Sequence, residues 1–365
     1  MTTEATPEER AAPRHSRLRE LHPGWFASVM GTAILAVATF DNPGNRAPVR
    51  DTAEAVAIGL AVIAYLLGAV LLVAYVLRWL LFTDAVAENL RHPVLGAMHA
   101  TVPAGLLVLA VMTSVVGPAF LPADAVAPVT AFLAVLGAGL GLVVSVAFAY
   151  ILFVGEHPAA AANGGWFIPP VATIIIPLAL MPLMRSVGLE FAKLLLALGY
   201  ATFGLGFLLF LFTMGLLHNR LVQHPLPPAA LAPAVWVGLG PVGVGALAPM
   251  ALARGGAELF GDAAPTVAIL SLLLSTGVWG FGLWWLAIAA ALLVRYLRNG
   301  GVPFHAGWWA FTFPLGAYTV ATLTLARAWQ LPVLEVATVV LYVLLLGFWV
   351  TVSVRTLASM RGGRA

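Results

Sequence analysis

The histidines are the residues of this 365-residue chain best suited to proton or metal chemistry, because the chain has no cysteine. His92 and His99 stand about two helical turns apart in HPVLGAMHATVP, which puts both rings on one face of a helix. Such a pair can bind a metal, relay a proton or simply pack. The surrounding residues do not match the H-E-x-x-H pattern of zinc hydrolases. We therefore predict no metal site and no cofactor, and keep His99 and His92 as candidate proton carriers.

Helix-breaking residues form a second pattern, in which the breaks recur about every 70 residues. The segment WFIPPVATIIIPLALMP (166–182) alone contains four prolines. A proline inside a helix costs about 3 kcal/mol, and in lipid no water satisfies the freed carbonyl groups. The recurrence predicts repeated helical hairpins, each with one broken helix. The predicted kinks are at Gly31, Pro103, Pro170, Pro177, Pro241 and Pro314.

The composition predicts the medium in which these helices lie. Hydrophobic residues make up 61% of the chain and charged residues 9%, with a mean hydropathy of +0.99. A soluble domain carries about a quarter of charged residues, so we predict an all-α polytopic membrane protein. The net charge of +3 gives no reason to expect a nucleic-acid partner. The ten expected spans are 24–40, 53–82, 94–116, 126–153, 166–184, 190–217, 228–252, 266–296, 306–328 and 333–356.

The charges at the ends of the spans predict the domain organisation. Residues 1–22 form a polar cytoplasmic tail, residues 23–358 the membrane transport domain, and residues 359–365 a short cytoplasmic C-terminus. Arginines are more frequent on the side that holds both termini, as the positive-inside rule requires of a chain with both ends in the cytoplasm.

The helix breakers fall in the odd-numbered spans, which predicts two layers. The even-numbered spans are longer and carry glycine clusters such as GAGLG (137–141), which suit close packing of helices. Irregular backbone is tolerated at membrane depth where it is buried in protein or lines a watery cavity. We therefore expect five kinked inner helices around a pore, with the kink residues lining that pore. Five straight outer helices are expected to face the lipid.

The predicted pore has features that favour anions. Cation pathways usually contain carboxylates within the membrane, and the predicted spans hold no pair or ring of them. The N-termini of broken helices instead offer about half a positive charge each. Phe311 and Phe313 lie shortly before Pro314, at the break in this span. A bulky aromatic there either closes the pore, since apolar constrictions gate by excluding water, or is an ordinary packed side chain.

The five odd spans together resemble the tellurite-resistance/dicarboxylate transporter family. This family includes tellurite-resistance permeases, malate permeases, sulfite efflux pumps and slow-type anion channels. The segments that carry the resemblance are HPGWFASVMGTAILAVAT (22–39), HPVLGAMHATVP (92–103), NGGWFIPPV (163–171), LPPAALAPAVWVGLGPVGVG (226–245) and WWAFTFPLGAY (308–318).

The resemblance implies a fold, an activity and an assembly. It implies ten helices in five hairpins, a homotrimer with one pore per subunit, and a phenylalanine on the ninth helix that closes the pore. Phe313 is the best match, and Phe311 the alternative. The expected function is transport, in the efflux direction, of small anions such as sulfite or C4-dicarboxylates across the plasma membrane, and not an enzymatic reaction. The alternative is a proton-coupled C4-dicarboxylate carrier that uses the pore histidines.

Overall fold

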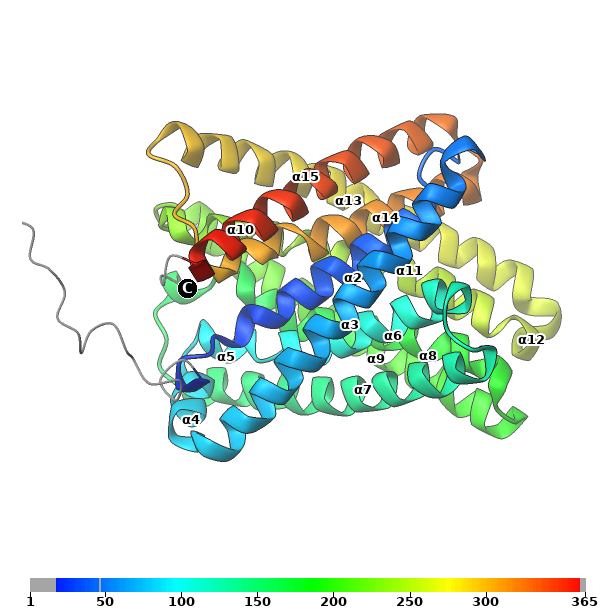
Figure 1. Ribbon diagram of the computed structural model, residues 1–365, viewed down its shortest axis with the longest axis horizontal. Coiled ribbons are helices and arrows are strands. Elements are labelled where there is room, and N and C mark those ends of the chain that lie inside the picture. Colours follow the sequence, from blue (N-terminus) through cyan, green and yellow to red (C-terminus); the bar gives the residue numbers. More distant parts are fainter. Residues whose placement is uncertain (1–17, 46, 362–365) are drawn as a thin grey trace, which may run out of the picture.

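The computed structural model describes residues 18–45 and 47–361, and these residues form an all-α structure without strands. Residues 1–17 of the expected tail and residues 362–365 lie outside the described residues. The described chain begins and ends at the same end of the molecule (Figure 1). This is the arrangement that an even number of spans produces.

Five shorter helices form the inner layer. Successive members are in contact, and the last contacts the first, so that they make a closed ring. Each begins at the same end of the ring, which we call the amino end; the opposite end is the carboxyl end. The inner helices are α2 (Phe26–Phe40), α6 (Thr101–Val116), α8 (Ile168–Leu180), α11 (Leu239–Gly255) and α14 (Phe313–Trp329).

Five longer helices surround this ring. Each packs against the inner helix before it in the chain and also against the next inner helix around the ring. At 30 to 35 residues they are longer than the ~20 residues that cross a bilayer. They are α3 (Arg50–Leu81), α7 (Ala123–Val154), α9 (Leu189–Gln223), α13 (Ala264–Arg298) and α15 (Pro332–Arg361).

Short helices and 3₁₀ turns connect the two layers. The short α-helices are α4 (Thr83–Arg91), α5 (Leu95–Met98), α10 (Ala232–Trp236) and α12 (Ala257–Phe260). The turns next to α2, α8 and α14 are η1 (Pro23–Trp25), η5 (Gly164–Phe167), η6 (Met181–Ser186) and η9 (Ala306–Phe311). The remaining turns are η2 (Ala47–Val49), η3 (Gly117–Ala119), η4 (Ala159–Ala161), η7 (Ala229–Leu231) and η8 (Gly261–Ala263).

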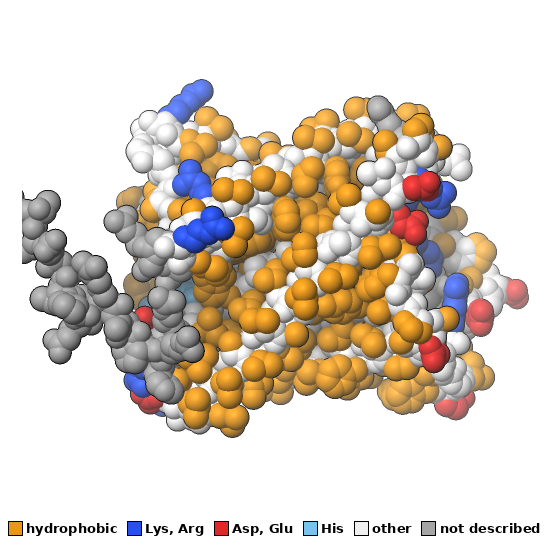
Figure 2. Space-filling model, in the orientation of Figure 1, with side chains coloured by type: hydrophobic (Ala, Val, Ile, Leu, Met, Phe, Trp, Pro, Cys, Tyr) orange, Lys and Arg blue, Asp and Glu red, His pale blue; other side chains and the backbone are white. Residues whose placement is uncertain are grey.

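Burial separates the layers as expected. In the four inner spans that are long enough to assess, at least 78% of the most apolar stretch is buried, against at most 33% in the outer spans. Figure 2 shows the outer surface as a broad apolar band, with charged side chains gathered at its two ends. The two-layer prediction is therefore confirmed, and the chain is a multi-pass membrane protein.

The expected number of ten spans stays a prediction. Within the described residues, nine helices are long and apolar enough to cross a membrane. The ninth expected span divides into η9 and α14, separated by Thr312, and α14 has only 17 residues. It is nonetheless almost wholly buried and completes the ring.

The prolines occupy different positions from those expected. Four of the prolines lie in the first turn of an inner helix, where a missing N–H costs little. They are Pro103 in α6, Pro170 in α8, Pro241 in α11 and Pro314 in α14. The breaks come before them, for example between α5 and α6 and between α10 and α11. Pro177 lies inside its helix, as predicted. The outer layer has an exception too, since Pro128 lies inside α7.

Candidate functional site: a cavity inside the helix ring

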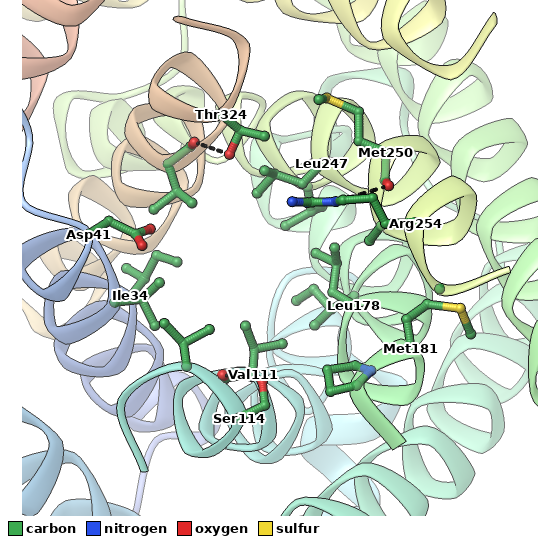
Figure 3. A pocket seen from close by; sticks show the side chains of 18 of the residues that line it. Ile34, Asp41, Val111, Ser114, Leu178, Met181, Leu247, Met250, Arg254 and Thr324 are labelled. Carbon is green, nitrogen blue, oxygen red and sulfur yellow. Dashed lines mark hydrogen bonds between the residues drawn. The ribbon is translucent and has the colours of Figure 1, made fainter. Parts of the chain in front are cut away.

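The ring encloses one large cavity of about 880 Å³, open toward the carboxyl end, to which all five inner helices contribute. Its wall is mainly aliphatic (Figure 3). The lining positions follow the three- and four-residue spacing of one helix face. They include 34, 37 and 41 in α2 and just beyond it, 108, 111 and 115 in α6, 244, 247, 251 and 254 in α11, and 320, 323 and 327 in α14.

The inner end of the cavity is bounded by Phe313, whose side chain is 4% exposed. Phe313 is the first residue of α14, directly after the break at Thr312. Gly240, in the first turn of α11, lies beside it, since a Cβ built there would be 3.7 Å from Phe313 Cε1 and 3.4 Å from Val171 Cγ2 of α8. The N-terminal ends of three inner helices therefore meet around the Phe313 side chain, and their dipoles create a positive electrostatic potential there.

Phe311 occupies a different environment. Its ring stacks on Phe348 at 5.0 Å between centroids and contacts Trp236 and Trp308 edge-on. These neighbours belong to α10, α15 and η9, and Phe311 does not line the cavity. Of the two candidates for the constriction, only Phe313 borders the cavity.

The predicted kink residues support the ring without forming the cavity wall. Gly31, Pro103, Pro170, Pro177, Pro241 and Pro314 are all buried, and none is among the residues that line the cavity. Gly31 has a packing role, because a Cβ there would lie 2.0 Å from Thr312 Oγ1 and 2.8 Å from Thr312 Cβ. It allows α2 to approach the break that places Phe313.

His92 and His99 are not brought together on the cavity wall. His92 is exposed, and its Nδ1 accepts hydrogen bonds from the backbone N–H groups of Val94 and Leu95 at 3.1 and 3.2 Å. His99 is 3% exposed and lies edge-on against Tyr75 and Trp79 of α3. Neither lines the cavity, and no group of three metal-ligating side chains occurs in the described part of the chain.

His92 belongs to a repeated capping motif that the sequence interpretation missed. Four inner segments begin with a side chain that accepts the backbone N–H two residues later, at 2.8 to 3.1 Å. The capping residues are His22, His92, Asn163 and His305. Each is the first residue of one of four similar tetrapeptides, HPGW, HPVL, NGGW and HAGW. The common spacing of about 70 residues was the available signal.

Four charged side chains at the carboxyl end of the cavity were also missed. Asp41, Arg185, Arg254 and Arg327 line the cavity mouth, and the sequence interpretation assigned none of them to the pore. Asp41 is partly buried, and this burial raises the pKa of its carboxyl above the ordinary value, against the opposing effect of Arg327 and Arg254. The sequence did contain a signal. The lining faces of three inner helices each continue, at helical spacing, to a charged residue at the helix end, namely Asp41, Arg254 and Arg327.

The chain thus has the architecture of a multi-pass membrane protein whose inner helices form a closed ring around a cavity, within an apolar outer layer. The sequence profile of one family, SLAC1, described as voltage-dependent anion channel, matches residues 20–357. The chain therefore belongs to the SLAC1 family of anion transporters, which confirms the resemblance seen in the sequence.

Full-length relatives agree with this assignment. Two uncharacterised transporters of Methanocaldococcus jannaschii are 32% and 30% identical to the chain, over 93% and 95% of it and 93% and 97% of their own lengths. The sulfite efflux pump SSU1 of Trichophyton rubrum is 24% identical over 92% of the chain and 89% of its own length.

Proposed function

We propose that the chain lets small anions such as sulfite or C4-dicarboxylates pass along the axis of the helix ring, in the efflux direction, with Phe313 as the constriction. The observation that carries this proposal is the cavity, which all five inner helices line and which ends at Phe313. Helix N-termini meet at the constriction, and three arginines against one aspartate line the mouth. Both features favour an anion over a cation.

Electrical driving force fits passive efflux. A membrane potential that is negative inside moves each negative charge outward with about 2.3 kcal/mol per 100 mV. Such export needs no coupled ion, and the lining residues include no histidine and a single carboxylate. The relation to sulfite efflux pumps makes sulfite the first substrate to test, and a C4-dicarboxylate the second.

The proton-coupled alternative assigns the proton to His99 or His92. It predicts that uptake of malate is accompanied by proton movement and that His99→Ala or His92→Ala abolishes this movement. Asn163→Ala, at the capping position equivalent to that of His92, should leave the movement intact. The positions of both histidines away from the cavity wall give this alternative no support beyond the sequence.

Assembly and orientation belong to the same proposal. We expect three copies of the chain in the plasma membrane, each with its own pore and with both termini in the cytoplasm. The exposed apolar faces of the outer helices supply surface for contacts with lipid and with other subunits.

Flux through purified protein in liposomes tests the proposal. Sulfite, malate, nitrate and chloride are offered in turn under one imposed potential, with potassium as the cation control. We expect at least one anion to move faster than in empty liposomes and potassium not to move. Currents selective for potassium would contradict the proposal.

A further inference from the structure

The mouth of the cavity carries an arrangement of charge that the constriction does not explain. Figure 3 shows Asp41 and Arg254 on opposite sides of the opening, and both line the cavity. Arg185 and Arg327 complete the charged lining. These four residues come at or just beyond the ends of three inner helices and in η6, and we call them the mouth cluster.

Within the mouth cluster, the three arginines differ in how firmly they are held. Arg327 donates from Nη2 to the backbone carbonyl of Asp41 at 2.6 Å and lies 3.7 Å from Glu335 of α15. Arg254 donates only from Nε, to the carbonyl of Met250 at 3.3 Å. Neither Arg254 nor Arg185 has a carboxylate within ion-pair distance in the described part of the chain. Arg254 therefore presents its terminal N–H groups to the cavity without a competing partner.

We propose that the mouth cluster is an anion-collecting site, in which Arg254 supplies the free guanidinium and Asp41 the opposing charge that limits how strongly anions gather. Its ligands are small carboxylates and oxyanions, because an arginine fork matches their paired oxygen atoms. This inference rests on the proposed function, since it assigns to this mouth the anions that cross the constriction.

Asp41 makes the site respond to acidity on the side that the mouth faces. The charged groups around it are Arg327 of α14, Arg254 of α11, Arg185 of η6 and Glu335 of α15, with Arg50, Asp51 and Glu54 exposed at the start of α3. Glu335 is tied to Arg327 and accepts a hydrogen bond from the Gly44 N–H. Burial raises the pKa of Asp41. Acidification therefore removes the negative charge of Asp41 at milder pH than for an exposed aspartate and leaves Arg254 and Arg185 without an opposing carboxylate at the mouth.

A chain without cysteine allows the local potential to be measured without any transport. Ser114 lines the cavity from α6, and Ser114→Cys creates a single reactive thiol there. The rate of labelling by an anionic thiosulfonate is divided by the rate for a cationic one of similar size. The ratio cancels the reactivity of the thiol itself, and it reports which sign of charge the cavity concentrates.

The expected ratio exceeds one and falls severalfold on Arg254→Gln, because removing one positive charge weakens both the attraction of the anionic reagent and the repulsion of the cationic one. Arg254→Lys retains the positive charge and should keep the ratio high. It serves as the second test if Arg254→Gln does not fold. Arg298→Gln, at the far end of α13, is the matched control and leaves the ratio unchanged. Asp41→Asn raises the ratio by a similar factor and removes its rise on acidification.

Equal ratios in the Arg254→Gln and Arg298→Gln variants, or a lower ratio in Asp41→Asn, would overturn the inference. Because labelling needs no flux, these results are separate from the fate of the proposed function. A normal ratio in a protein that passes no anion would instead refute the proposed function and leave the charge arrangement intact.

Discussion

At the scale of single residues, the environment of a side chain decides its role more than its type does. Phe311 and Phe313 are two positions apart, yet Phe311 packs among aromatic rings of its own turn and of two other elements, whereas Phe313 ends the cavity. From the residues alone, either phenylalanine could close the pore or be an ordinary packed side chain, because helix phase beyond an irregular turn at Thr312 cannot be read from spacing. The resemblance favoured Phe313, and its place at the cavity supports that choice.

Gly31 provides a stability prediction at this scale. Gly31→Ala places a methyl group 2.8 Å from Thr312 Cβ, so either α2 or the break before Phe313 must move. We expect a loss of about 1 to 3 kcal/mol of stability, the usual cost of overpacking, measured as a lower unfolding temperature in detergent. Gly59→Ala in α3 is the control, since nothing lies within 4 Å of its added Cβ. Equal unfolding temperatures for the two variants would contradict this packing role.

At the scale of elements, the repeated hairpin explains both the prolines and the caps. Each inner helix starts after an irregular segment. Four of the five have a proline in the first turn, where its missing N–H group leaves no hydrogen bond unmade. The interval of about 70 residues was visible in the sequence and predicted the hairpins and the two layers. It did not place the breaks, because a proline in the first turn and one in a helix interior look alike in a purely apolar segment.

The capping residue His22 makes stability depend on pH. His22 Nδ1 must be unprotonated to accept the Gly24 N–H, and burial, followed by the charges of His305 and Arg78, lowers the pKa of His22. The folded state thus binds fewer protons than the unfolded state between the lowered pKa and the ordinary value of about 6.5. The stabilisation is complete above that ordinary value and is lost as the pH falls below it.

His22→Asn tests this dependence, since its side-chain oxygen can accept the same hydrogen bond without titrating, as Asn163 does. Unfolding temperatures at pH 7.5 and pH 5 are compared for both proteins. We expect the wild-type protein to lose more stability on acidification than the variant. Equal losses would exclude His22 as the titrating group.

At the scale of the whole molecule, the charged ends and the apolar band define how the chain lies in a membrane. Both ends of the described chain lie together (Figure 1). The arginine bias then predicts that this end faces the cytoplasm. The cavity mouth, at the opposite end of the ring, would then face outward. The continuation of the lining faces onto charges can be seen in the sequence, but the convergence of these charges at one mouth cannot, because it depends on the closure of the ring.

Single cysteines test the orientation. In cells, Ser186→Cys at the carboxyl end should react with a membrane-impermeant thiol reagent, and Ser359→Cys near the end of α15 should react only after the membrane is opened. Both serines belong to described elements at opposite ends of the ring. The reverse pattern would place the mouth in the cytoplasm and contradict the orientation that we propose.

The central claim is that anions cross the ring at Phe313. Its most direct test is the anion current through liposomes containing the wild-type protein, Phe313→Ala or Phe311→Ala. Removing the ring that ends the cavity should raise the current about tenfold or more without admitting potassium, because an apolar constriction blocks by excluding water. Phe311→Ala should lower stability but leave the current per folded molecule near that of the wild type. An unchanged current in Phe313→Ala, or an equal rise in both variants, would contradict the account.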